Sequence, residues 1–250
     1  MLGFVQGLTE FIPVSSSGHL VLVPAFFGWS RPSVAVDVLL HGGTLIAAVV
    51  YFRRDIYEVL TSDRKTGLWL VVATIPAAAA GVALQGFFEP FFDNPAAAAV
   101  FLVLTGAILV AADAVGRDRL KADDLGAVRA LFIGVWQALS IFPGISRSGA
   151  TLSGGMFAGL SREEATRFAF LLSIPIIAGT VIFKAGDALG SPGGAAELLS
   201  ALPGAATAAV TGYFAIRFFL RYVKEHKLTV FAVYCWSVAA VYAASCWLTP

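Results

Sequence analysis

The sequence predicts an all-α, polytopic membrane protein with six transmembrane helices and two re-entrant helix hairpins arranged as an inverted repeat. Of its 250 residues, 58% are hydrophobic and 13% are charged, whereas soluble domains are typically about 25% charged. This composition excludes a water-soluble fold. The formal net charge of +1 gives no reason to expect a nucleic-acid partner. We therefore expect a single integral membrane domain over residues 1–250.

Six apolar runs are long enough to cross a bilayer, because a spanning helix needs roughly 20 mostly apolar residues. The runs are about 33–52, 66–86, 95–115, 163–183, 203–223 and 228–248. These runs account for the six expected transmembrane helices.

Two further apolar regions are interrupted near their middle. Residues 3–28 are broken at Pro13 and the serines that follow, and residues 128–160 are broken at Pro143 and Gly144. Each half has about 10 residues and spans ~15 Å at about 1.5 Å per residue, which is about half a bilayer. Bare backbone groups are not tolerated in lipid, so the breaks must lie against protein or a water-filled cavity. We expect each region to form a re-entrant hairpin.

Basic residues predict how the chain is oriented. They follow the first and third spans and surround the end of the fifth: Arg53, Arg54, Arg64, Lys65, Arg117, Arg119, Lys121, Arg129, Arg217, Arg221, Lys224 and Lys227. Segment 87–94 has no Lys or Arg, and segment 184–200 has only Lys184. The positive-inside rule places the basic loops in the cytoplasm. The first hairpin then enters from outside, the second enters from inside, and the C-terminus lies outside.

The two broken regions align without a gap when the chain is shifted by 131 positions. GFVQGLTEFIPVSSSG (3–18) lies over GVWQALSIFPGISRSG (134–149), with identical residues at seven of these positions. The same shift relates whole spans, which predicts two repeats at about 1–116 and 127–250. Each repeat contains three spans, an odd number, so the halves should be inverted. Inverted repeats with broken helices place a binding site near the midplane of the membrane.

Both breaks carry residues suited to binding an anion. A helix is expected to start near Gly18 and another near Gly149, and helix N-termini present free N–H groups and the positive end of the helix dipole. Arg147 can hold phosphate oxygens in a bidentate manner. The hydroxyls expected to bind phosphate are those of Ser15, Ser17, Ser146, Ser148 and Thr151. At least one serine is also expected to cap a helix.

The first break also carries candidate catalytic groups. Glu10 is an ionisable residue in an apolar run, where a charge is costly; it is a metal ligand, a general base or an interfacial residue facing water. His19 is the expected general acid or base. Ser16 is a candidate nucleophile activated by His19 or Glu10. The alternatives are that Ser16 only hydrogen-bonds the phosphate, or that water attacks the phosphate directly. Gln6 is expected to contact substrate, whereas Gln137, its repeat equivalent, is expected to pack.

The motifs QGLTEFIPVSSSGH (6–19) and PGISRSGAT (143–151) closely resemble those of the undecaprenyl-diphosphate phosphatases, the bacitracin-resistance family. The likeness extends through VDVLLHGGTL (36–45) and covers essentially the whole chain. The family's first motif has Glu or Gln at the position of Gln6, and members with Glu there have two carboxylates that are candidate metal ligands. This chain has one carboxylate in the motif, so the resemblance does not imply a paired-carboxylate metal site here. Asp37 and His41, spaced i, i+4, share one helix face and are either a brace for a hairpin or a pair near the outer interface.

The resemblance implies a hydrolase that removes the terminal phosphate of undecaprenyl diphosphate to give undecaprenyl phosphate and inorganic phosphate. This reaction recycles the lipid carrier for peptidoglycan synthesis and confers bacitracin resistance. The resemblance also implies a divalent cation, Mg²⁺ or Ca²⁺, held by Glu10, and an active site open to the periplasmic side of the bacterial inner membrane. The expected partners are the polyprenyl diphosphate and the bilayer, and the oligomeric state is left open with a homodimer as one candidate.

Two other functions compete with this one. Inverted repeats with broken helices are also the architecture of many transporters, so the chain could transport an anion or flip a lipid phosphate. A lipid phosphatase of the vanadium-haloperoxidase type is suggested by Ser-Gly-His but needs two further motifs that the sequence does not contain in order. A reactive set of Glu10, Ser16 and His19 at one break favours the hydrolase, because binding alone would not need it.

Overall fold

The computed structural model describes residues 1–30, 32–115, 120–190 and 194–248. These residues contain α-helices joined by short connections. The helices are α1 (Leu2–Phe11), α2 (Ser16–Phe27), α3 (Val34–Tyr51), α4 (Arg53–Thr61), α5 (Arg64–Ala83), α6 (Gln85–Phe92), α7 (Pro95–Val115), α8 (Gly126–Leu139), α9 (Arg147–Phe157), α10 (Arg162–Gly190), α11 (Gly194–Glu225) and α12 (Thr229–Leu248), with a 3₁₀ turn η1 (Ala122–Asp124). The all-α prediction is confirmed.

In the described part of the chain, six helices are long and apolar enough to cross a membrane, namely α3, α5, α7, α10, α11 and α12. They coincide with the six predicted runs, so the chain is a multi-pass membrane protein. Helices α10 and α11 have 29 and 32 residues and are longer than the sequence pattern indicated. Arg117 and Arg119 of the predicted basic loop lie outside the described residues, and the orientation of the chain in the membrane stays a prediction.

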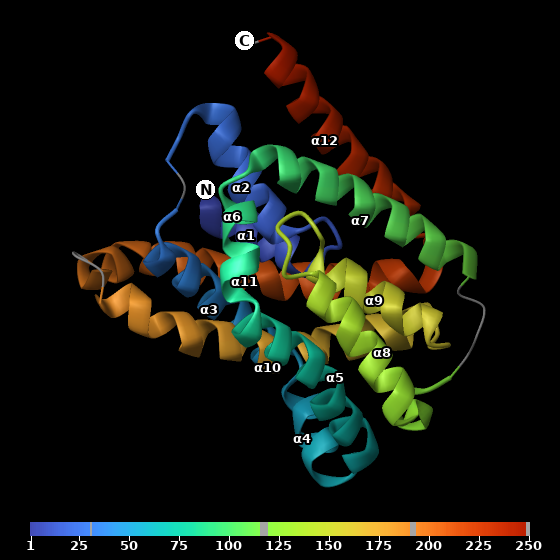
Figure 1. The fold of residues 1–250 in the computed structure, drawn as a ribbon. Helices are drawn as coiled ribbons and strands as arrows, with labels where there is room; N and C mark the ends of the chain where they lie inside the picture. The colour runs from blue at the N-terminus through green and yellow to red at the C-terminus, as the bar shows by residue number, and fades with distance from the viewer. Residues whose placement is uncertain (31, 116–119, 191–193, 249–250) are drawn as a thin grey trace.

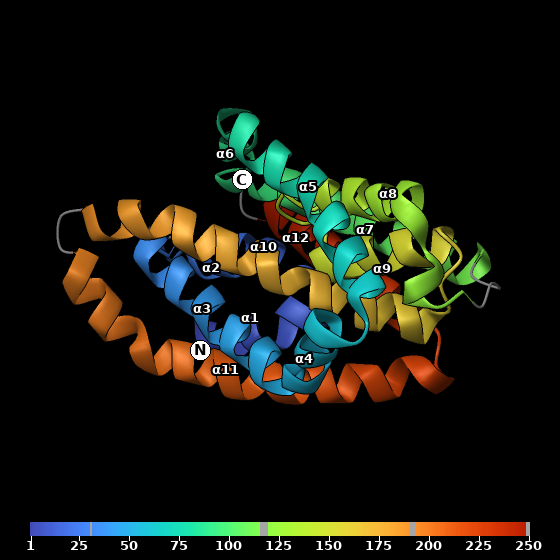
Figure 2. The ribbon, with the colours of Figure 1, turned by 90° about the horizontal axis from the view of Figure 1, so that it is seen from below.

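Helices α1 and α3 lie between the two longest helices (Figure 2), where α1 packs on α11 and α3 packs on both α10 and α11. Helices α7 and α12 pack against each other along another side of the molecule (Figure 1). Helix α5 packs on α8, and α9 packs on α7, α8 and α10. The short helices α1, α2, α8 and α9 are thus held by the longer ones.

Two kinds of contact position α1. At its C-terminal end Phe11 meets Phe170 of α10 edge-on, with 5.4 Å between ring centroids. Nearer the middle of α1, Gly7 lies so close to α11 that a Cβ there would be 2.6 Å from the carbonyl oxygen of Ala208. Small residues of this kind let helix backbones approach closely inside a membrane. The position of Glu10, one residue before Phe11, follows from this packing.

Both broken regions consist of two short helices, as the sequence indicated. Helix α1 ends at Phe11 because Pro13 disfavours helical geometry at the preceding Ile12, whose φ and ψ are −72° and 136°. Helices α2 and α9 begin at Ser16 and Arg147, which are 131 positions apart. Whether the two pairs are re-entrant, and whether the two halves are inverted, stay predictions.

Candidate active site

The starts of α2 and α9 are capped in the same way. Ser15 Oγ accepts a hydrogen bond from the N–H of Gly18 (3.2 Å), and Ser146 Oγ accepts one from the N–H of Gly149 (3.1 Å). In both breaks a second serine hydroxyl, of Ser17 or Ser148, lies 3.2 Å from the capping hydroxyl. Serine capping is therefore confirmed at both helix starts, and the two repeats share it.

The two breaks are in contact with each other, which brings the two helix N-termini together. A Cβ on Gly18 would lie 3.1 Å from Gly144 Cα, and a Cβ on Gly149 would lie 3.3 Å from Pro13 Cβ. Ser148 Oγ donates across the junction to the carbonyl of Ile12 (3.3 Å). In Figure 1 the loop between α8 and α9 accordingly lies beside the loop between α1 and α2.

Thr105 of α7 braces the second break. Its hydroxyl donates to the carbonyl of Gly144 (2.8 Å) and accepts from the N–H of Ser146 (3.0 Å). Gly144 has a φ of +103°, which glycine adopts without strain. Both backbone groups are buried, so without Thr105 they would be left unpaired. This role could not be predicted from the sequence, because Thr105 lies inside an ordinary apolar span.

Glu10 is the centre of the site. Its side chain is 1% exposed and forms an ion pair with Arg147 through Oε1. Its other oxygen, Oε2, accepts from Ser16 Oγ (2.6 Å) and from Gln6 Nε2 (2.8 Å). The predicted residues Gln6, Glu10, Ser16 and Arg147 thus meet at one carboxylate. Arg147 was predicted to bind phosphate, and in this structure its guanidinium is paired with the Glu10 carboxylate.

His41 is a further neighbour of Glu10. Its Nε2 lies 3.9 Å from Glu10 Oε2, and its Nδ1 lies 2.9 Å from the carbonyl oxygen of Asp37 and 3.4 Å from Asp37 Oδ1. Lys184 Nζ lies 3.6 Å from Asp37 Oδ2. The i, i+4 spacing in the sequence placed Asp37 and His41 on one face correctly. It did not reveal that this face meets Glu10, because that contact depends on how α1 packs on α3.

His19 is buried but does not bond Ser16 or Glu10. Its Nδ1 lies 2.8 Å from the carbonyl oxygen of Ser15, and its Nε2 lies 2.8 Å from the hydroxyl of Tyr234. Of the two activators considered for Ser16, Glu10 is therefore in hydrogen-bond contact with it, whereas His19 bonds Ser15 and Tyr234. Tyr234 was missed by sequence reasoning, since it is one aromatic residue among many in an apolar span.

Two of the predicted substrate-binding residues have an unpaired atom. Thr151 Oγ1 and Gln6 Oε1 are buried and have no hydrogen-bond partner among the described residues. Buried polar atoms are rarely left unpaired. These two atoms are therefore available to bind a ligand. The amide nitrogen of Gln6 already donates to Glu10, so its Oε1 lies beside that carboxylate.

The oxygen atoms around Glu10 fit a hard divalent cation. Mg²⁺ prefers oxygen ligands and is often held by one or two carboxylates together with substrate phosphates. Glu10 supplies one carboxylate, and Gln6 supplies the unpaired carbonyl oxygen. No group of three or more His, Cys, Asp or Glu side chains suited to a metal occurs in the part of the chain that the structure describes. A cation here would thus depend on substrate oxygens as well.

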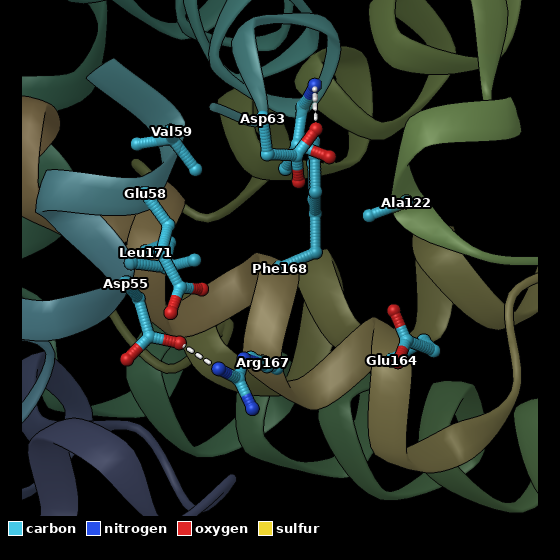
Figure 3. A pocket seen from close by; sticks show the side chains of 10 residues that line it. Asp55, Glu58, Val59, Asp63, Ala122, Glu164, Arg167, Phe168 and Leu171 are labelled. Atoms are coloured by element: carbon cyan, nitrogen blue, oxygen red, sulfur yellow. Dashed lines mark hydrogen bonds and ion pairs between the residues drawn. The ribbon is translucent and has the colours of Figure 1, made fainter. Parts of the chain in front are cut away.

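A separate cavity of about 200 Å³ lies between α4, α5 and α10 (Figure 3). Four carboxylates line it, those of Asp55, Glu58, Asp63 and Glu164. Its one lining cation, Arg167, is paired with Asp55. This excess of negative charge opposes binding of a phosphate. None of the predicted site residues lines it, so the Glu10 cluster is the better candidate for phosphate chemistry.

The Glu10 cluster combines a hydroxyl, a carboxylate in hydrogen-bond contact with it, and a guanidinium. A hydroxyl bonded to a base is the arrangement of an activated nucleophile. The guanidinium and the two helix N-termini can stabilise charge on a transferring phosphoryl group. Ser16, Ser17 and Arg147 are half-buried and give access to the cluster. The arrangement is therefore suited to phosphoryl transfer.

Comparison with known proteins agrees with this chemistry. Residues 1–241 match the model of the family described as Bacitracin resistance protein BacA. A protein of Moorella thermoacetica named undecaprenyl-diphosphatase is 43% identical over 99% of this chain and 97% of its own. Proteins with the same name from Rubrobacter xylanophilus (42% identity, 98% and 96% coverage) and Geobacter sulfurreducens (43%, 94% and 92%) are also similar. The chain therefore belongs to the bacitracin resistance protein BacA family.

Proposed function

We propose that this protein is an undecaprenyl-diphosphatase, a membrane hydrolase that converts undecaprenyl diphosphate into undecaprenyl phosphate and inorganic phosphate. The observation that carries the proposal is the meeting of Ser16, Glu10 and Arg147 at two helix N-termini. The family and the names of its relatives support the same reaction. In the cell this reaction would recycle the lipid carrier of peptidoglycan synthesis and confer resistance to bacitracin.

The terminal phosphate is bound at the junction of the two breaks. Arg147 is the main cationic group there, and the helix N-termini add N–H donors and dipole charge. The phosphate competes with Glu10 for the guanidinium, which leaves the carboxylate free to act on Ser16. The remaining donors are Gln6, Ser15, Ser17, Ser146, Ser148 and Thr151.

Ser16 is the proposed nucleophile and Glu10 its base. As Ser16 Oγ attacks the terminal phosphorus, its proton passes to Glu10 across the 2.6 Å hydrogen bond. The bond between the terminal phosphorus and the bridging oxygen breaks, and undecaprenyl phosphate leaves. Water then cleaves the Oγ–P bond, which releases inorganic phosphate and restores the serine. His19 is the proposed acid–base group that serves the leaving phosphate or the attacking water.

Glu10 and the Gln6 carbonyl oxygen are the groups that would hold a Mg²⁺ or Ca²⁺ ion. When bound, such an ion neutralises the charge that develops on the diphosphate oxygens. The chain's own contribution is to place the carboxylate, the amide and the serine hydroxyl on one side of the phosphate. This arrangement is secured by the packing of α1 against α3 and α11.

The protein is proposed to reside in the bacterial inner membrane with this site open to the periplasmic side. The distribution of basic residues supports that orientation. A homodimer is a candidate assembly. Transport of an anion or lipid phosphate is the less favoured function, because a hydroxyl in short contact with a buried carboxylate has a use in hydrolysis and none in passive binding.

The test is release of inorganic phosphate from undecaprenyl diphosphate by the purified chain in detergent. Detergent has no second compartment, so transport cannot contribute. We expect release that EDTA abolishes and that Mg²⁺ or Ca²⁺ restores, with little activity in Glu10→Ala and Arg147→Ala. Folded wild-type protein that releases no phosphate with any divalent cation would refute the proposed hydrolysis.

A further inference from the structure

The two ring nitrogens of His19 have different partners. Nδ1 faces the carbonyl oxygen of Ser15 at 2.8 Å, and a carbonyl can only accept a hydrogen bond. Nδ1 must therefore carry the hydrogen in this contact. In a neutral ring Nε2 is then an acceptor, and the hydroxyl of Tyr234 donates to it at 2.8 Å. Tyr234 is thus the group that faces the basic nitrogen of His19.

The Ser15 carbonyl is itself held in a restricted orientation. Ser15 has a φ of +67°, a conformation that no other non-glycine residue adopts in the described part of the chain. Its carbonyl accepts from both the N–H (3.2 Å) and the Nδ1 of His19. Residues in such sparsely populated conformations persist only where their surroundings hold them, often at functional sites. One side of the His19 ring is therefore fixed by the first break.

The other side of the ring is fixed by α12. The rings of His19 and Tyr234 are nearly parallel, at 10°, with centroids 5.7 Å apart. The next residue, Cys235, is fully buried, and its Sγ lies 3.9 Å from the carbonyl oxygen of Pro13. Helix α12 thus contacts the first break at two adjacent positions. Tyr234 itself is 43% exposed, so it stands between the buried His19 and the outside of the protein.

We propose that Tyr234 is a positioning residue for His19 in the hydrolysis of the lipid diphosphate. The Ser15 carbonyl sets the Nδ1–H tautomer, and Tyr234, by donating to Nε2, holds the ring in one orientation. A phenolic hydroxyl can donate to a neutral imidazole and accept from a protonated one. It can therefore remain the partner of Nε2 in both protonation states of the ring, which phenylalanine cannot do. This inference rests on the proposed function, because it gives Tyr234 an effect on turnover only through His19.

The test compares Tyr234→Phe with wild type, using the full chain in detergent and undecaprenyl diphosphate as substrate. Tyr242→Phe is the matched control, because Tyr242 is also on α12 and packs edge-on against Phe26 with 5.8 Å between ring centroids. We expect Tyr234→Phe to lower kcat about tenfold, a part of the roughly 10²–10⁴-fold that a positioned acid–base group supplies. KM should change less than about twofold, because Tyr234 acts through His19. Tyr242→Phe should leave both constants unchanged.

Two further measurements separate positioning from a merely structural role. In a His19→Gln background, Tyr234→Phe should have no additional effect on kcat. Nitrogen-15 NMR of histidine-labelled protein, with the signals of His19 assigned from His19→Gln, should show the Nδ1–H tautomer in both wild type and Tyr234→Phe. The Nε2 signal should shift in Tyr234→Phe, because that nitrogen loses its hydrogen-bond donor.

An unchanged kcat in Tyr234→Phe, additive effects of the two substitutions, or an unchanged Nε2 signal would each overturn the inference. The NMR comparison needs no activity. Absence of phosphate release from wild type would therefore refute the proposed function separately. An Nε2 signal that does not change in Tyr234→Phe would refute this inference by itself.

Discussion

Ser16 and Arg147 are the first residues of two helices at equivalent repeat positions, and they hold opposite oxygens of one carboxylate. Ser16 donates to Glu10 Oε2 at 2.6 Å, and Arg147 pairs with Glu10 Oε1. Each follows a serine that caps its helix. The same local geometry therefore presents a hydroxyl from one repeat and a guanidinium from the other. Glu10 has no acidic counterpart, since Ile141 occupies the equivalent position.

Replacement of Ser16 by Ala should reveal whether its hydroxyl is the nucleophile. We expect phosphate release to fall by about 10³-fold or more, because the covalent route is lost. With undecaprenyl diphosphate radiolabelled in the terminal phosphate, rapid acid quenching should trap label on wild type and none on Ser16→Ala. Ser17→Ala is the control, since Ser17 also lies in the first turn of α2 but bonds Ser15. Label retained in Ser16→Ala would exclude Ser16 as nucleophile.

Replacement of Arg147 by Lys should preserve the charge but not the guanidinium geometry. We expect kcat/KM to fall about 10–100-fold in Arg147→Lys and further in Arg147→Ala, because Lys binds phosphate as a point charge. The measurement is steady-state phosphate release. Arg167→Ala is the control, because Arg167 pairs with Asp55 in the separate cavity of Figure 3 and should not alter the rate. Equal rates in Arg147→Lys and wild type would argue against bidentate phosphate binding.

Replacement of Thr105 by Val should loosen the second break. Valine keeps the shape of threonine but leaves the buried Gly144 carbonyl and Ser146 N–H without their partner. We expect a loss of about 1–3 kcal/mol in stability, the typical cost of an unpaired buried group, and a lower kcat. Thermal unfolding in detergent measures the loss of stability. Thr74→Val is the control, because Thr74 bonds a carbonyl within its own helix, and a similar loss there would contradict the bracing role.

Replacement of Gly7 by Ala should separate α1 from α11. The new Cβ would lie 2.6 Å from the carbonyl oxygen of Ala208, and backbone atoms cannot yield as a flexible side chain can. Overpacking of this kind typically costs about 1–3 kcal/mol, and displacement of α1 should also reduce activity through Glu10. Gly42→Ala is the control, because a Cβ there meets nothing within 4 Å. Equal apparent melting temperatures for the two variants would refute the close approach.

Much of the architecture follows from local sequence properties. The six spans could be predicted because a long apolar run has one stable form in lipid, a helix. The breaks at Pro13 and Gly144 could be located because proline and glycine act on the backbone next to them. The serine caps at Ser15 and Ser146 are equally local, since each bonds an N–H three residues away.

The contacts that organise the site are not local, and the sequence indicated only some of them. From the sequence, Glu10 and Arg147 could belong to one site only if the two breaks met. That Arg147 pairs with Glu10, and that His41 adjoins the same carboxylate, depends on the relative placement of α1, α3 and α9. His19 was one of two activators considered for Ser16, and it is bonded instead to Tyr234, 215 positions away.

The sequence by itself determined that this chain is a helical membrane protein of the BacA family, which residues break its short helices and which side chains are candidates for its chemistry. These properties depend on composition and on interactions over a few residues. Only the tertiary structure decided how those side chains pair: Ser16 with Glu10, His19 with Tyr234, and Thr105 with the second break. The physical reason is that each pairing joins helices distant in the chain, and their relative placement is set by the packing of whole helices.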